Sequence, residues 1–252
     1  MAVASVATVG YGGFLAGPPI LVREVVGTLV GGLLFAPGKG NALEKQDLQK
    51  ALLSTVKILV LDPDLEVLGT CSGTHLGEGV IVTNWHCVGH TDLYGNEDDT
   101  GLGVGHGETY NPDGIVAIAP QNDPRQIPKP TYFAQVVSGE ADVDVAVVKI
   151  SGMIDPKANL PAAIPIPAMT ITDSSKVEIG DPVYVFGYPG VGGQRITFTK
   201  GEISGFEDQT NDGEPDSFKT DAAINPGNSG GLATDDDGDQ IGIPTFSSLS
   251  QQ

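Results

Sequence analysis

The sequence predicts an all-β protein built from two packed antiparallel β-barrels of six strands each. The chain of 252 residues contains 35 Gly and 18 Pro, whereas aromatic residues make up only 6% of it. This composition favours short strands joined by tight turns over long helices. Runs rich in β-forming residues fall into two series, and residues 151–167, rich in Pro and Ala, separate the series as a linker.

Residues 43–150 are expected to form a short helix and the first barrel. Residues 43–54 place leucines near helical spacing among charged side chains, which predicts an amphipathic helix. The strands of the first barrel are predicted from short β-rich runs bounded by Gly, Pro, Asn and Asp. These runs are 56–61, 67–70, 79–83, 115–119, 133–137 and 145–150.

Residues 168–252 are expected to form the second barrel. Its predicted strands are 183–186, 195–199, 202–206, 218–220, 231–233 and 240–245. Residues 1–42 are assigned to a signal peptide or a membrane anchor and placed outside the fold, because an apolar stretch follows Arg23 and small residues follow that stretch. A misassigned start codon and an extension packed on the mature fold are the alternatives.

The net charge of −19, with only 13 Lys and Arg residues, argues against binding to nucleic acid or to an anionic membrane surface. A saline habitat and colloidal solubility both account for such acidity. The acidic runs 97–99, 208–216 and 235–239 are interpreted as solvated turns. The last run alternates Asp residues but lacks the length, the sixth Gly and the final Glu of an EF-hand loop. Neither a metal nor a cofactor is predicted.

A serine lies in a glycine-rich turn directly before a short apolar run, as N-P-G-N-S-G-G at residues 225–231. A serine nucleophile needs a base, a group that orients the base, and donors for the developing oxyanion. Glycines permit a turn that directs the N–H groups of Gly227 and Ser229 toward one point. Ser229 is therefore the candidate nucleophile. Because G-x-S-G-G also occurs in inert loops, the interpretation requires the other parts elsewhere in the chain.

His86 is the candidate general base and is expected at the end of the strand predicted over 79–83. A histidine in that place is otherwise structural. A disulfide between Cys71 and Cys87 would staple the hairpin that presents His86, and by the loop-entropy model it would contribute about 3 kcal/mol. The competing interpretation is a zinc site formed by both cysteines, His75 and His86. Neighbouring residues on a strand point to opposite faces, which argues against a metal shared by His86 and Cys87.

Asp144 directly precedes an apolar run that predicts a buried strand, and it is the candidate for the acid that orients His86. A carboxylate at that edge is partly desolvated and needs a partner, and an imidazolium supplies one. Asp142 is the rival, because it lies on the same strand face. It stands further from the apolar run and is therefore expected to be better solvated.

The order His, Asp, Ser and five motifs resemble the chymotrypsin-like serine endopeptidases, most closely their bacterial HtrA/Deg-like branch. Residues 72–88 are similar to the family's hairpin ending in T-N-x-H, and residues 144–150 resemble D-[IV]-A-[VL]-[VL]-K-[IV]. The likeness covers most of residues 55–247. Its other segments are 177–190, 199–205 and 220–231, the last with the sequence T-D-A-A-I-N-P-G-N-S-G-G.

The resemblance implies a chymotrypsin-like double barrel with His86, Asp144 and Ser229 as the catalytic triad. It implies Gly227 and Ser229 as the donors of the oxyanion hole. Among substrate-binding residues, it implies that Thr245, Phe246 and Ser247 pair with the substrate backbone. It also implies that Ala223 lies at the base of the primary specificity pocket and favours uncharged side chains there.

The two cysteines differ from most HtrA-like chains and resemble the disulfide that secreted trypsin-like enzymes place behind the catalytic His. A Cys71–Cys87 disulfide indicates an oxidising compartment. The chain ends at Gln252, before the strand that should wall the pocket, the C-terminal helix and any PDZ domain that the resemblance implies. It is therefore expected to be a fragment or a truncated product whose second barrel is incomplete at its C-terminus.

These observations predict an exported serine endopeptidase, periplasmic or extracellular, that hydrolyses peptide bonds through an acyl-enzyme intermediate. Its expected partners are polypeptide substrates, unfolded ones among them, and a membrane only through an N-terminal anchor. Two alternatives remain: a non-catalytic binding module on the same scaffold, and an esterase-type acyl hydrolase.

Overall fold

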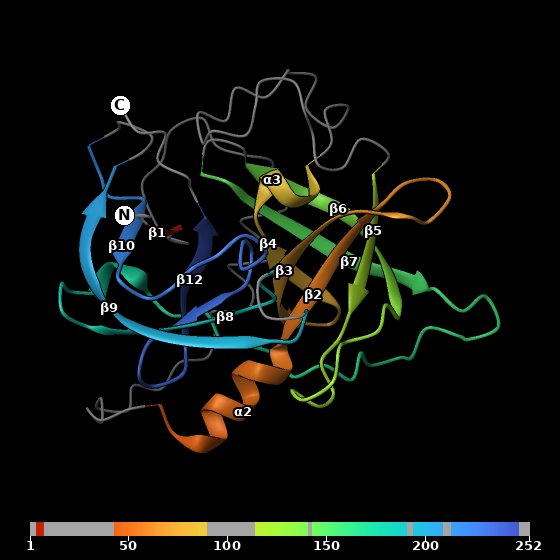
Figure 1. The fold of residues 1–252 in the computed structure, drawn as a ribbon, viewed down its shortest axis with the longest axis horizontal. Helices are drawn as coiled ribbons and strands as arrows, with labels where there is room; N and C mark the ends of the chain where they lie inside the picture. The colour runs from red at the N-terminus through yellow and green to blue at the C-terminus, as the bar shows by residue number, and fades with distance from the viewer. Residues whose placement is uncertain are drawn as a thin grey trace.

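The computed structural model describes residues 4–7, 43–89, 114–140, 143–190, 194–208 and 213–246. These residues form two closed antiparallel barrels of six strands each, which lie side by side (Figure 1). The predicted all-β double barrel is confirmed.

The first barrel has the strand order β2-β3-β4-β7-β6-β5, and β5 pairs back onto β2 to close it. Its interior is a single cluster of buried aliphatic and aromatic side chains, among them Ile58, Ile81 and Val148. Every residue of β2 is buried, because one face of this strand packs into the barrel and the other meets further apolar residues. The strands are β2 (Thr55–Leu61), β3 (Val67–Gly77), β4 (Val80–Thr83), β5 (Ile115–Ala119), β6 (Tyr132–Glu140) and β7 (Val145–Met153).

The second barrel has the strand order β1-β10-β9-β8-β11-β12 and its own core, which includes Val183, Ile203 and Phe218. Five of its strands come from the C-terminal half of the chain. They are β8 (Pro182–Gly187), β9 (Thr197–Glu207), β10 (Ser217–Thr220), β11 (Leu232–Thr234) and β12 (Gln240–Phe246).

The sixth strand of the second barrel is β1 (Ala4–Ala7), at the other end of the chain. It pairs antiparallel with β10 on one side and with β12 on the other, so that Val6 lies between Phe218 and Pro244. The structure thus differs from the expectation that residues 1–42 stand outside the fold. The barrel position expected to be empty is taken by an N-terminal segment, while residues 8–42 lie outside the described part of the chain.

Strand β9 is one long strand, whereas the sequence predicts two strands, 195–199 and 202–206. Gly201 pairs with Val183 in the continuous ladder from β8 to β9. A Cβ at Gly201 would collide with the backbone of Ala222, which explains the glycine. The glycine therefore marks a close approach of backbone within a strand and not a break between two strands.

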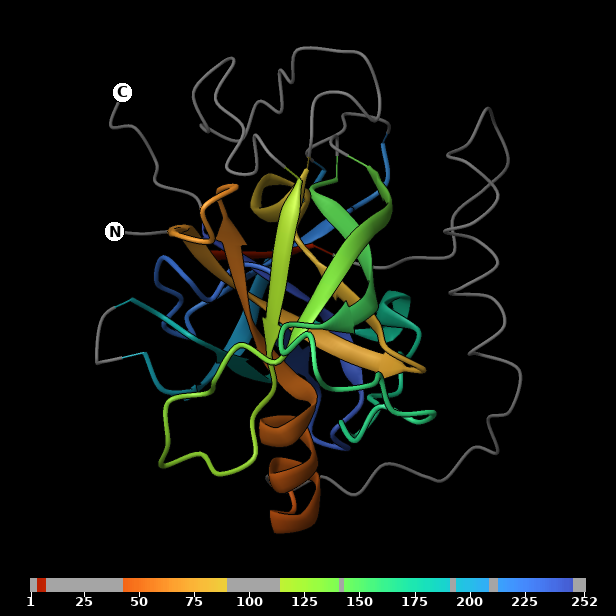
Figure 2. The ribbon, with the colours of Figure 1, turned by 90° about the vertical axis from the view of Figure 1, so that its right-hand side faces the viewer.

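A third apolar cluster joins the two barrels. Leu76 and Val82 of the first barrel meet Phe186 and Leu232 of the second, and helix α2 (Lys45–Ser54) packs its apolar face against the same cluster. Helix α2 lies at one end of the molecule, and the short helix α3 (Trp85–Val88) lies at the other (Figures 1 and 2). None of the helices in the described ranges has the length and apolar character needed to cross a bilayer.

Candidate active site

His86 lies on the short helix α3, which packs against β3, β6 and β7 of the first barrel. The prediction that it ends a strand is therefore wrong. Strand β4 stops at Thr83, and the chain turns at Asn84 into one helical turn that Gly89 closes by donating its N–H to the carbonyl of Trp85. A Cβ at Gly89 would clash with the Trp85 ring, so the turn closes only with glycine there.

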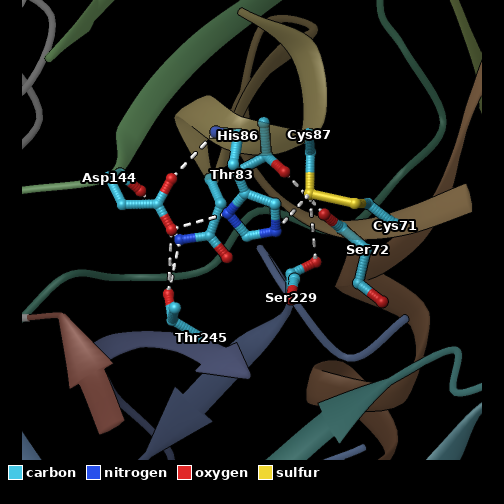
Figure 3. A network of polar contacts seen from close by, with 9 residues as sticks. Cys71, Ser72, Thr83, His86, Cys87, Asp144, Ser229 and Thr245 are labelled. Carbon is cyan, nitrogen blue, oxygen red and sulfur yellow. Dashed lines mark hydrogen bonds and ion pairs between the residues drawn. A yellow bond between two sulfur atoms is a disulfide. The ribbon is translucent and has the colours of Figure 1, made fainter. Parts of the chain in front are cut away.

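The carboxylate of Asp144 binds His86 twice. Its Oδ2 lies 2.7 Å from Nδ1 of the imidazole, and its Oδ1 accepts the backbone N–H of His86 at 2.8 Å (Figure 3). The Asp144 side chain is 3% exposed. A carboxylate held against Nδ1 orients the ring and leaves Nε2 as the nitrogen that can accept a proton. The rival Asp142 lies outside the described residues.

Two further side chains support Asp144, and sequence reasoning assigned this role to neither. Thr245 donates its hydroxyl to Oδ2 of Asp144 at 3.3 Å. Asn84 donates its amide both to the carbonyl of Asp144 and to Thr245 Oγ1, each at 2.7 Å. Asp144 has a φ of 51°, a backbone conformation that non-glycine residues rarely adopt, and these bonds hold it there. The N of the T-N-x-H motif was the only sequence signal for this support.

Ser229 is buried in a turn that strand β3 anchors. The backbone N–H of Ser72 donates to the carbonyl of Ser229 at 2.8 Å, and the Ser72 hydroxyl donates to the carbonyl of Gly227 at 2.7 Å. Gly227 has a φ of +100°, and a Cβ there would lie 2.5 Å from the carbonyl oxygen of Tyr188. Only glycine fits this position. Within the described residues, the N–H groups of Gly227 and Ser229 donate to no other protein group.

The predicted disulfide between Cys71 and Cys87 is present and lies beside the His86 ring (Figure 3). The sulfur of Cys87 lies 3.6 Å from Nε2 of His86 and 4.0 Å from the carbonyl oxygen of Ser229. The bridge therefore links β3, which anchors the Ser229 turn, to the helix that carries His86.

The argument from strand faces against zinc does not apply, because His86 and Cys87 lie on a helix. Ligand atoms of Cys71, His86 and Cys87 lie within 4.8 Å of one another, but a disulfide provides no thiolate for a metal. His75, the fourth residue of the alternative zinc site, contacts the carbonyl of Pro167 and accepts the N–H of Gly79 with its ring.

The residues predicted to bind substrate differ in exposure and in their contacts. Ala223 is exposed, and its carbonyl accepts the hydroxyl of Thr199. Thr245 is buried, with its side chain committed to Asp144. Phe246 ends β12 opposite Ala4, and Ser247 lies outside the described residues. Their roles toward a substrate remain predictions.

Known proteins resemble this chain in sequence and in fold. Residues 71–243, which include His86, Asp144 and Ser229, match the family model described as "Trypsin-like peptidase domain". The chain is 34% identical over 192 residues to "Protease Do-like 1, chloroplastic" of Arabidopsis thaliana, an alignment that covers 72% of this chain and 35% of that protein. It is 35% identical over 116 residues to a "Probable periplasmic serine endoprotease DegP-like" of Chlamydia muridarum, which covers 45% of this chain and 21% of that protein.

Among solved structures, the serine endoprotease from Yersinia pestis superposes with a TM-score of 0.57 and 25% identity, covering 86% of this chain and 61% of the other. The chain spans about a third of the length of Protease Do-like 1 and about a fifth of the length of the Chlamydia protein. The chain belongs to the trypsin-like peptidase family, in the branch of the Do-like and DegP-like serine endoproteases.

Proposed function

We propose that this chain is a serine endopeptidase that hydrolyses polypeptides with Ser229 as nucleophile, His86 as general base and Asp144 as the residue that orients the base. The observation that carries the proposal is the pair of hydrogen bonds that the Asp144 carboxylate accepts from His86, beside the turn of Ser229. Membership of a peptidase family supports the same chemistry.

The proposed reaction begins with transfer of the Ser229 hydroxyl proton to Nε2 of His86 as the oxygen attacks the scissile carbonyl. The N–H groups of Gly227 and Ser229 donate to the oxyanion that forms on the carbonyl oxygen. Protonated His86 then gives its proton to the leaving amine, and the C–N bond breaks. Water, deprotonated by His86, hydrolyses the acyl-enzyme ester and restores Ser229.

Asp144 stabilises the imidazolium in both halves of this cycle. Its burial excludes water from the carboxylate, so that the charge interaction with His86 is weakly screened. The hydrogen bonds from Thr245 and from the His86 backbone keep the carboxylate in place.

The proposed substrates are polypeptides, and unfolded chains are the first to test because they expose extended backbone. We further propose that the protein is exported, since its disulfide requires an oxidising compartment and the Chlamydia relative is described as periplasmic.

The decisive experiment compares the wild-type chain with Ser229→Ala on unfolded casein and on a fluorophosphonate probe that labels activated serines. The wild type should cleave casein and take up the probe, and Ser229→Ala should lose about 10⁶-fold in turnover together with the label. Ser151→Ala, on an exposed side chain of β7, is the matched control and should behave as the wild type. Equal casein cleavage by the wild type and Ser229→Ala contradicts the mechanism. A wild type that takes up the probe and hydrolyses ester substrates, but cleaves no peptide, is an esterase.

A further inference from the structure

A cavity of about 290 Å³ lies beside the turn that carries Ser229. Its walls include Leu59 and Val67 of the first barrel and the segment from Tyr188 to Gly190 that follows β8. Gly190 donates its N–H to the carbonyl of Pro226, directly before the Ser229 turn. One wall of the cavity is therefore hydrogen-bonded to the segment that leads into the Ser229 turn.

A second set of contacts ties the cavity to the same turn. The N–H of Tyr188 donates to the hydroxyl of Ser72, and this hydroxyl donates to the carbonyl of Gly227. Thr70, another lining residue, directly precedes the disulfide residue Cys71. The cavity thus lies on the disulfide side of Ser229.

Lys57 of β2 lines this cavity although its side chain is cationic and the residue is only 5% exposed. An ammonium group carries three donors, and within the described residues that of Lys57 makes one hydrogen bond, at 3.2 Å to Oε1 of Gln194. No carboxylate of the described residues forms an ion pair with it. Burial lowers the pKa of Lys57. A buried cation without an anionic partner is costly, so the cavity favours a ligand that carries a negative charge.

The position of the cavity indicates which part of a substrate reaches it. Thr245, near the end of β12, lies on the Asp144 side of the reaction centre, whereas Cys71 and Ser72 lie on the opposite side of Ser229 (Figure 3). If the residues before the scissile bond pair with β12, the residues after the scissile bond pass over the disulfide toward the cavity. Apolar walls and one buried cation suit an acidic side chain with an aliphatic stem.

We propose that Lys57 determines specificity by binding a carboxylate on one of the first three residues after the scissile bond. This inference rests on the proposed peptidase function. The carboxylate comes either from an Asp or Glu side chain or from the C-terminus of a short leaving peptide, and the experiment separates these sources.

The test uses fluorogenic peptides with Glu or Gln at the first, second or third residue after the scissile bond, and peptides that end there as a free acid or as an amide. For the wild type, kcat/KM is expected to be about tenfold higher for Glu than for Gln at one of these positions, as for a charge-assisted hydrogen bond. Lys57→Met and Lys57→Gln should abolish this ratio while the Gln peptide is still cleaved, and Lys57→Arg should retain it. Lys176→Met, on an exposed lysine, is the matched control.

The same peptides are also measured for binding to Ser229→Ala and to Ser229→Ala with Lys57→Met. A Lys57-dependent affinity for the carboxylate without any turnover would support the cavity and refute the peptidase function. Turnover of all peptides with equal kcat/KM for Glu and Gln at every position, and for acid and amide, would overturn the inference and leave the peptidase function intact. A Glu preference that survives both neutral substitutions of Lys57 would also overturn it.

Discussion

Asp144 is hydrogen-bonded to both the ring and the backbone of His86: its Oδ2 lies 2.7 Å from Nδ1, and its Oδ1 lies 2.8 Å from the amide nitrogen. One carboxylate therefore sets the orientation of the imidazole and the position of the helical turn that carries it. Asp144 directly precedes β7 of the first barrel, and its Oδ2 also accepts the hydroxyl of Thr245 on β12 of the second barrel. The contact between Asp144 and Thr245 therefore joins the two barrels at the candidate active site.

Asp144→Asn is expected to reduce kcat by about 10⁴-fold with little change in folding. The asparagine oxygen can still accept the backbone N–H of His86, but its NH₂ group then faces Nδ1. The imidazole must accept there and carries its proton on Nε2, where it cannot deprotonate Ser229. Steady-state kinetics with a peptide substrate measure the loss, and Asp155→Asn, on an exposed turn, is the control. A loss below tenfold in a folded variant would contradict the assigned role.

Ser72→Ala is expected to lower kcat and to reduce the free energy of unfolding by about 1–3 kcal/mol, since the N–H of Tyr188 and the carbonyl of Gly227 both lose a buried partner. The catalytic loss arises because the turn at Gly227 is no longer held in place, so that its N–H loses its fixed direction. Urea unfolding and kcat are measured together. Ser72→Thr, which keeps the hydroxyl, should recover part of kcat, and equal defects in both variants would refute the role of the hydroxyl.

Val6→Pro is expected to reduce the free energy of unfolding by about 2 kcal/mol, because β1 is bonded on both sides and proline removes a ladder bond whichever neighbour its N–H faces. Val6→Ala keeps the backbone N–H and serves as the control. Unfolding in urea, followed by circular dichroism, distinguishes the two. Identical midpoints for the proline and alanine variants would show that the N-terminal strand does not close the barrel in solution.

Asp235 gives the unfolding free energy a dependence on pH. Burial raises its pKa from 3.8 to about 6, and neighbouring carboxylates of the same turn add to the rise. The folded state therefore holds a proton that the unfolded state has released, so Asp235 stabilises the fold below pH 3.8 and this stabilisation is lost as the pH rises through about 6.

Asp235→Asn removes the free-energy cost of ionising a buried carboxylate, and its side-chain oxygen still accepts the N–H groups of Asp237 and Asp239. The variant should be more stable than the wild type by about 3 kcal/mol at pH 7, with almost no difference near pH 3.5. Urea unfolding at a series of pH values measures this. Asp237→Asn, on an exposed side chain of the same turn, should show a smaller pH-dependent gain. A gain for Asp235→Asn that is the same at every pH would contradict burial as its cause.

The strands of both barrels were predictable because their signal is local. The run 115–119 matches β5 at both ends, and most other predicted strands lie within the observed ones. The candidate residues were recognisable for a related reason, because glycines around Ser229 and the apolar run after Asp144 stand beside them in the sequence. The disulfide was likewise confirmed, since its spacing allows it to close the hairpin.

Local patterns misled where a residue's role depends on a distant neighbour. The predicted strands stop at residue 199 and resume at residue 202, yet Gly201 lies inside β9, where the backbone of Ala222 leaves no room for a side chain. His86 follows a strand-like run, yet the turn closed by Gly89 and Trp85 makes a helix there.

By itself, the sequence determined the all-β class, the two series of strands and the residue types that could perform acyl transfer, because each is written in short-range periodicity and turn chemistry. Only the tertiary structure decided that β1 completes the second barrel, that Thr245 supports Asp144 across 101 residues of chain, and that Lys57 is buried beside the Ser229 turn. Such contacts join segments that local propensity treats independently, and they form only where the packing of the two barrels brings those segments within bonding distance.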